Sequence, residues 1–126
     1  MATNISPKKI LIADDEKAIA KALALKLAKV GFVAEVAVNG VEAIEKIKAT
    51  KFDLVILDLI MPEKDGFAVL EYMRANKINY PVLVASNLSQ EEDLKRAKDL
   101  GAIDYFIKSN LSLQDIIDHI KKILKV

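Results

Sequence analysis

The sequence contains no cysteine and no tryptophan, and it has a single histidine among its 126 residues. Without cysteine, disulfide bonds, thiolate catalysis and zinc–thiolate sites are excluded. The one histidine, His119, falls on the flank of the apolar face of the last predicted helix. We therefore interpret it as a surface residue rather than as a metal ligand or a phosphohistidine.

Long apolar runs and an excess of charge of one sign are also missing. No segment approaches the ~20 apolar residues of a membrane-spanning helix, and none near Met1 resembles a signal peptide. The 19 lysines and arginines nearly balance the 18 acidic residues, which leaves a net charge of +1. This balance gives no electrostatic reason to expect nucleic acid or a membrane as a partner. We expect a cytoplasmic protein that binds neither directly.

The composition is that of a globular protein with a substantial core. Apolar residues make up 52% of the chain and charged residues 29%, values typical of folded rather than disordered proteins. A chain of this length suits one domain. We expect a short polar lead over residues 1–7 and a single domain over residues 8–126, with no linker or output domain after it.

Short apolar runs alternate with amphipathic helical patterns along the whole chain. The runs are typical of strands, and they cover residues 10–13, 33–38, 54–57, 82–86 and 104–108. Strands that alternate with helices favour a parallel sheet covered by helices on both faces. The sequence therefore predicts an α/β fold of five strand–helix units.

The helical segments carry start signals and apolar faces. In the first helix, Ile19, Leu23, Leu27 and Val30 recur at helical spacing and are expected to face the core. Four capping signals are expected to begin the later helices: Asn39, Asp65, Ser89-x-x-Glu92 and Ser112-x-x-Asp115.

Polar side chains stand at the carboxyl ends of four predicted strands. Asp14 and Asp15 follow the first strand, Asp58 the third, Ser86 ends the fourth and Lys108 ends the fifth. Ligands of open parallel sheets bind at this edge. Carboxylates held close together repel one another unless a cation such as Mg²⁺ joins them, and a lysine suits a phosphoryl oxygen. The pattern predicts a site for a metal ion and a phosphoryl group.

The motifs ILIADDE, LVILDLIMPEKDG, PVLVAS and GAIDYFIK together resemble the receiver domain of bacterial two-component response regulators over residues 8–124. The resemblance implies the doubly wound, flavodoxin-like fold with strand order 2-1-3-4-5. It also implies a function in phosphorelay signal transduction: a receiver domain takes a phosphoryl group from a histidine kinase or a phosphotransfer protein. Such a domain promotes its own phosphotransfer and dephosphorylation and is not a metabolic enzyme.

The resemblance also implies a role for each site residue. Asp58 would be the phosphoacceptor, a carboxylate nucleophile that forms an aspartyl-phosphate. Mg²⁺, with Mn²⁺ as a substitute, would be held by Asp58, by Asp15 directly, by Asp14 through water and by the backbone carbonyl of Ile60. Lys108 would pair with the phosphoryl oxygens.

Two further residues would carry the signal outward. Ser86 would move to hydrogen-bond the phosphoryl group, and Tyr105 would change rotamer in response. The surface formed by the helix at 91–99, the fifth strand and the last helix would then be recognised by a downstream partner or a fused output domain, and a homodimer could form on it. Apart from the family, Tyr105 could instead be a strand aromatic that packs on the last helix.

Several residues depart from the usual pattern of the family. Ser109 stands where proline, joined by a cis bond, usually follows the lysine, so we expect a trans peptide here and leave the reach of Lys108 open. Asn87 is larger than the usual small residue and could narrow access to Asp58. Ile60 and Leu88 are apolar where some relatives place polar residues that orient water, so we expect a long-lived phosphorylated state.

Three other functions are weighed against this one. A hydrolase using DxD chemistry does not fit, because the acids of the first strand are adjacent. A flavodoxin-like cofactor binder needs a glycine-rich phosphate loop after that strand, but the chain has only four glycines. A pseudo-receiver, which binds proteins without being phosphorylated, stays open because of Ser109.

Overall fold

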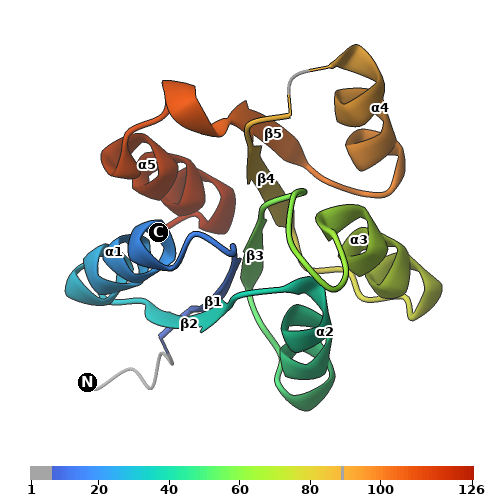
Figure 1. Cartoon of the computed structure of the whole chain (residues 1–126). Helices are drawn as coiled ribbons and strands as arrows, with labels where there is room; N and C mark the ends of the chain where they lie inside the picture. The colour runs from blue at the N-terminus through green and yellow to red at the C-terminus, as the bar shows by residue number, and fades with distance from the viewer. Residues whose placement is uncertain (1–6, 89) are drawn as a thin grey trace.

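The computed structural model describes residues 7–88 and 90–126, and the predicted lead over residues 1–7 falls almost entirely outside them. Strands and helices alternate along the chain (Figure 1). The strands are β1 (Lys9–Ala13), β2 (Val33–Ala37), β3 (Leu54–Leu57), β4 (Val82–Ser86) and β5 (Asp104–Ile107). The helices are α1 (Lys17–Lys29), α2 (Gly40–Ala49), α3 (Gly66–Ala75), α4 (Glu91–Asp99) and α5 (Leu113–Leu124), with a 3₁₀ turn, η1 (Lys108–Asn110), before the last. The predicted five strand–helix units are confirmed.

The strands form one parallel sheet in the order β2-β1-β3-β4-β5, which confirms the doubly wound, flavodoxin-like arrangement. All side chains of β3 and β4 are buried, as expected for central parallel strands covered on both faces. The predicted strand ends are correct within one residue. Each strand therefore delivers the residue that follows it to a common edge of the sheet.

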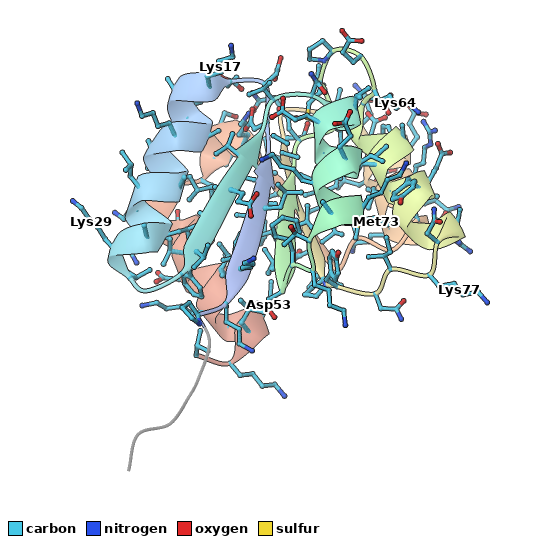
Figure 2. All side chains as sticks on the ribbon, turned by 90° about the horizontal axis from the view of Figure 1, so that it is seen from below. Lys17, Lys29, Asp53, Lys64, Met73 and Lys77 are labelled. Atoms are coloured by element: carbon cyan, nitrogen blue, oxygen red, sulfur yellow. The ribbon has the colours of Figure 1, made fainter. Side chains whose placement is uncertain are left out.

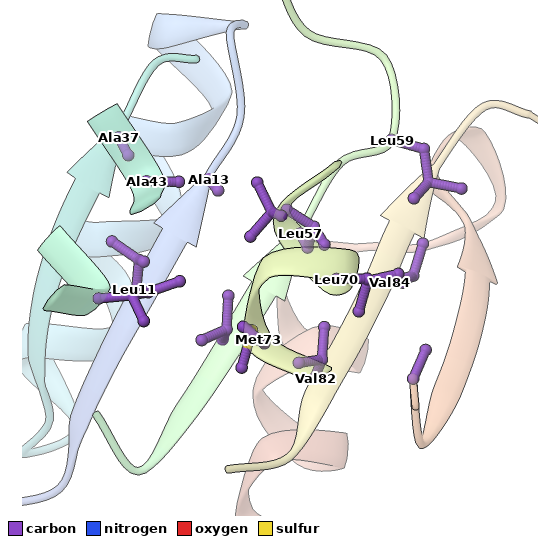
Figure 3. Packing of buried hydrophobic residues seen from close by; sticks show 14 of the residues in the cluster. Leu11, Ala13, Ala37, Ala43, Leu57, Leu59, Leu70, Met73, Val82 and Val84 are labelled. Carbon is purple, nitrogen blue, oxygen red and sulfur yellow. The ribbon is translucent and has the colours of Figure 1, made fainter. Parts of the chain in front are cut away.

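Helices cover both faces of the sheet (Figure 1). Helices α1 and α5 pack on one face, and their buried residues include Leu23, Leu27 and Ile117. Helices α2, α3 and α4 pack on the other, where Leu70 and Met73 of α3 meet the sheet (Figure 3). Burial of these apolar side chains is the main favourable contribution to folding.

The predicted apolar face of α1 is correct at Leu23 and Leu27 but wrong at its two ends. Ile19 and Val30 are 41% and 43% exposed, and Ala20 is fully buried instead. The buried stripe therefore runs through Ala20, Leu23 and Leu27, at spacings of three and four residues that also fit one face of a helix. The periodicity did not distinguish the two adjacent stripes, and the small alanine lies where the helix meets the sheet.

Three of the four predicted caps are confirmed. Asn39 and Asp65 accept backbone N–H bonds at the starts of α2 and α3, and Ser112 forms a reciprocal capping box with Asp115 at α5. Ser89 lies outside the described residues, and the N-cap of α4 is Gln90, which makes no side-chain capping bond. Gln90 therefore lacks the side-chain capping bond that Asn39 and Asp65 make in the other helices on this face.

Two glycines allow the loop between β3 and α3 to pack closely against its neighbours. A Cβ atom on Gly66 would clash with the carbonyl oxygen of Asp58, and one on Gly40 would clash with that of Lys64. Lys17 and Lys64 lie at this end of the sheet, and Asp53 lies at the other (Figure 2). The close contacts fix the loop that starts at Asp58.

Candidate functional site

Buried polar side chains gather at the carboxyl edge of the sheet. Asp14, Asp58 and Ser86 are the polar or charged residues that are buried in the described part of the chain. The backbone N–H of Asp58 donates to the carbonyl of Ala13 at 2.9 Å, which extends the β1–β3 pairing by one residue. This bond holds the first residue after β3 beside the end of β1, and so places the two aspartates next to each other.

Lys108 is the cation at the centre of this cluster. Its Nζ atom lies 2.7 Å from a carboxylate oxygen of Asp14, 3.1 Å from one of Asp58 and 2.6 Å from one of Glu16. Burial alone would lower the pKa of Lys108, but hydrogen bonds to these carboxylates outweigh it and raise the pKa above its usual value. Lys108 is therefore charged, and it reaches Asp58 although no proline follows it.

For the pKa of Asp14, burial outweighs the hydrogen bonds. Burial raises the pKa of its carboxyl group, and the negative charge of Asp58 adds to this effect; the hydrogen bonds from Lys108 and from the backbone of Glu16 lower it, but the increase dominates. Two buried carboxylates next to each other are unfavourable without a compensating cation. The site is thus built to hold positive charge.

The side chain of Ser86 is hydrogen-bonded directly to Asp58. Its hydroxyl donates to Oδ1 of Asp58 at 2.8 Å, and the same oxygen accepts the backbone N–H of Ile60 at 3.1 Å. The other carboxylate oxygen, Oδ2, faces Lys108. Asp58 therefore has a hydrogen-bonding or charged partner at each oxygen, on different sides of the carboxylate.

Tyr105 connects the polar side chains around Asp58 to the loop after β4. Its hydroxyl donates to the backbone carbonyl of Leu88 at 2.7 Å, and Ser86 Oγ lies 3.4 Å from the backbone N of Leu88. The pKa of Tyr105 is raised by burial and by the negative charges of Asp93 and Asp58. Tyr105 packs against the apolar cluster covered by α2, α3 and α4, so the alternative in which it packs on the last helix is wrong, and its change of rotamer stays a prediction.

The carboxylates that could hold a metal ion differ in one member from the predicted set. Oxygen atoms of Asp14, Glu16 and Asp58 all lie within 4.8 Å of one another. Asp15 is exposed and is not part of this group, so its role as a direct ligand stays a prediction. The backbone N–H of Glu16 donates to Asp14 at 2.9 Å, and this tight turn places Glu16 at the site. The third acid of the run Asp14–Asp15–Glu16 was the signal that the sequence reasoning missed.

The oxygen chemistry of this cluster fits a hard divalent cation. Mg²⁺ prefers carboxylate and carbonyl oxygens together with water, and three carboxylates converge here. An acidic cluster of this kind is typical of a Mg²⁺ site. The carbonyl of Ile60 follows directly in the chain, and the Ile60 side chain is 52% exposed; its part as a backbone ligand stays a prediction.

The residues that depart from the usual pattern border the same site. Asn87 is exposed, and its side-chain Oδ1 accepts the backbone N–H of Ser109 at 3.0 Å. Among the described residues there is no cis peptide bond, so the predicted trans peptide before Ser109 is confirmed.

His119 lies away from the cluster of polar side chains at the sheet edge. It is half-buried, and its ring packs on that of Phe106 with the ring centroids 4.3 Å apart.

No helix among residues 7–88 and 90–126 is long and apolar enough to cross a membrane.

Comparison with known proteins yields a family match and close structural neighbours. Residues 10–121 match the family described as the response regulator receiver domain. The chain is 36% identical over 125 residues to the chemotaxis protein CheY of Treponema pallidum, with 97% of this chain and 86% of that protein covered. It is 35% identical over 118 residues to the alkaline phosphatase synthesis transcriptional regulatory protein PhoP of Bacillus subtilis, with 94% of this chain and 49% of that protein covered. The chain thus spans about half of the length of such longer relatives.

A solved structure of the response regulator TrrA from Thermotoga maritima, in complex with Mg²⁺ and beryllofluoride, superimposes with a TM-score of 0.80. The two sequences are 29% identical, and the superposition covers 92% of this chain and 98% of that one.

Proposed function

Because this chain belongs to the response regulator receiver domain family of two-component systems, we propose that Asp58 accepts a phosphoryl group from a histidine kinase. The chain is a receiver domain that acts in phosphoacceptor signal transduction, and it is not a metabolic enzyme. One observation carries the assignment of the acceptor. Asp58 is the buried carboxylate that contacts both a hydroxyl donor, Ser86, and the lysine, Lys108.

The proposed reaction is an in-line transfer to a carboxylate. A carboxylate oxygen of Asp58 forms a bond to phosphorus while the bond from phosphorus to the imidazole nitrogen of the donor histidine breaks. Lys108 moves from the carboxylates to one phosphoryl oxygen, and the hydroxyl of Ser86 donates a hydrogen bond to a second phosphoryl oxygen. These two contacts stabilise negative charge that the carboxylate cluster alone would repel.

We propose that Mg²⁺, or Mn²⁺ in its place, binds at Asp14, Asp58, Asp15 and the carbonyl of Ile60. The converging oxygens of Asp14 and Asp58 support this set, and Glu16 adds a further carboxylate close to them. When bound, the ion supplies charge neutralisation for the transferring phosphoryl group. Asp15 would have to turn inward from its exposed position to join.

We propose that the surface formed by α4, β5 and α5 changes on phosphorylation and is the surface that partners recognise. Ala97 is the one fully buried residue of α4, so little apolar packing fixes this helix. Tyr105 joins β5 to the loop that precedes α4 through the Leu88 carbonyl. A change at Ser86 can therefore reach this surface, where a downstream protein, a fused output domain or a second copy would bind. A cytoplasmic location accords with this role, and we expect no direct contact with nucleic acid or membrane.

Three residues at the rim are proposed to tune access and hydrolysis. Ile60 is exposed and Leu88 is half-buried, and neither side chain can orient water for attack on the phosphoryl group. We also propose that Asn87, the exposed residue before Leu88, narrows access to Asp58. We propose that the apolar pair prolongs the lifetime of the aspartyl-phosphate.

The proposed function is tested by titrating the protein with beryllofluoride, which mimics a phosphoryl group, and with Mg²⁺. The amide resonances of residues 86–88 and of Lys108–Asn110 are expected to shift only when both are present, because the adduct recruits Ser86 and Lys108. The Asp58→Ala variant should show no such shift. A wild-type protein without shifts would refute Asp58 as acceptor and favour a pseudo-receiver that acts by binding alone.

A further inference from the structure

Two residues that depart from the usual pattern of the family are hydrogen-bonded to each other. Asn87 immediately follows Ser86, and Ser109 immediately follows Lys108. The backbone N–H of Ser109 donates to the side-chain oxygen Oδ1 of Asn87 at 3.0 Å. The bond therefore joins the loop after β4 to the turn after β5, one residue beyond each phosphoryl-binding side chain.

We propose that this bond sets the position of Lys108 relative to Ser86, and that Asn87 is a positioning residue for phosphoryl transfer. The proposal rests on the proposed function, because it assigns Asn87 a part in the reaction at Asp58. Asn87 acts through the backbone N–H of Ser109, which its side-chain oxygen accepts.

The turn that carries Lys108 has few bonds of its own. The 3₁₀ turn Lys108–Asn110 has no side-chain cap, and the backbone bond from the N–H of Leu111 to the carbonyl of Lys108 is long, at 3.3 Å. Short 3₁₀ turns have poorer hydrogen-bond geometry than α-helices. A bond from outside the turn therefore has a large share in holding its backbone in place.

The loop after β4 is held from the β5 side at two successive residues. Ser109 donates to the side chain of Asn87, and Tyr105 donates to the carbonyl of Leu88. The Tyr105 contact would be lost if that side chain changed rotamer. The Asn87 contact does not depend on Tyr105, so it can hold the two loops together in either state of the tyrosine.

The two residue types complement each other. A proline at position 109 would have no N–H to donate, and an alanine or glycine at position 87 would have no oxygen to accept it. The pair thus provides a link that the usual residues at these positions could not form. It also accounts for the reach of Lys108, whose Nζ lies 3.1 Å from Asp58 in the absence of that proline.

The expected effect of losing the bond is moderate. The partners are neutral and exposed, and a single hydrogen bond of this kind changes a rate or an equilibrium by about two- to tenfold. Phosphoryl uptake should slow by this factor in Asn87→Leu, which keeps the side-chain size and removes the acceptor.

The test combines amide hydrogen exchange with a double-mutant cycle on the full chain. The Ser109 amide should exchange faster in Asn87→Leu than in the wild type, whereas Asn87→Asp, which keeps an acceptor oxygen, should restore its protection. Phosphoryl uptake from acetyl phosphate at saturating Mg²⁺ should slow by about two- to tenfold in Asn87→Leu. In a Ser109→Pro background the same substitution should have no further effect, because the donor is already gone.

Each outcome of this test is decisive. Unchanged Ser109 exchange in Asn87→Leu, or an equal slowing in both backgrounds, would overturn the inference. If the wild type takes up the phosphoryl group and every variant does so at the same rate, the positioning role of Asn87 is overturned and the proposed function stands. No uptake by any variant or by the wild type would refute both. Ser109→Ala, which keeps the N–H, serves as control and should behave as the wild type does.

Discussion

Replacing Lys108 with methionine is expected to change two properties in opposite directions. Phosphoryl uptake at Asp58 should slow by about 100-fold, the usual cost of removing one preorganised group that stabilises charge in a transition state. Mg²⁺ should bind about tenfold more tightly, because the competing ammonium group is gone. Uptake from acetyl phosphate and a Mg²⁺ titration measure the two effects on the same variant.

The position of Lys108 explains both the slower phosphoryl uptake and the tighter Mg²⁺ binding. Its Nζ lies between 2.6 and 3.1 Å from carboxylate oxygens of Asp14, Glu16 and Asp58, and these are the oxygens that converge as a cation site. A unit charge at about 4 Å contributes about 1 kcal/mol even at the dielectric constant of water. The ammonium group thus repels the metal ion, yet it supplies the positive charge that an incoming phosphoryl group needs.

A matched control is Lys51→Met, which removes the same charge from an exposed position before β3, at the opposite end of the sheet. It should leave both properties unchanged. Weaker Mg²⁺ binding in Lys108→Met would show that the lysine organises the carboxylates rather than competes for them. Unchanged uptake would remove Lys108 from the proposed reaction.

Leu88→Glu is expected to shorten the lifetime of the phosphorylated protein by roughly tenfold. A carboxylate beside the phosphoryl group can orient or deprotonate the attacking water, and positioned general bases contribute ~10²–10⁴-fold to such steps. We expect less than the full range, because residue 88 lies in a loop and its side chain is only half-buried. The measurement is the first-order loss of phosphate after the donor is removed.

Two further variants separate chemistry from packing. Leu88 packs partly against the apolar cluster under α3 and α4, so Leu88→Ala reports the effect of lost packing alone and should accelerate hydrolysis little. Ile60 is 52% exposed, so Ile60→Glu adds a carboxylate without disturbing the core and should also accelerate it. Equal rates in Leu88→Ala and Leu88→Glu would assign the effect to loop mobility and contradict the account.

Most of the fold could be predicted from sequence because its determinants are local or periodic. The five apolar runs identify the strands, and Asn39, Asp65 and Ser112 mark helix starts that the structure confirms. The polar residues at strand ends indicated where Asp58 and Lys108 would meet. A parallel sheet brings such ends together whatever the connecting helices contain.

Other features depend on geometry that spacing does not contain. The rotation of α1 decides that Ala20 rather than Ile19 is buried, and a pattern of spaced apolar residues allows both. The choice between Asp15 and Glu16 depends on the direction of one turn, which the bond from Glu16 to Asp14 sets. The bond between Asn87 and Ser109 joins residues 22 positions apart, so no local pattern could reveal it.

The most direct test of the central claim is intact-mass spectrometry after incubation with Mg²⁺ and acetyl phosphate. The wild-type protein should gain the mass of one phosphoryl group, and this gain should disappear without Mg²⁺ and in Asp58→Ala. A gain that persists in Asp58→Ala, or no gain in the wild type with acetyl phosphate or a histidine kinase donor, would contradict Asp58 as the phosphoacceptor.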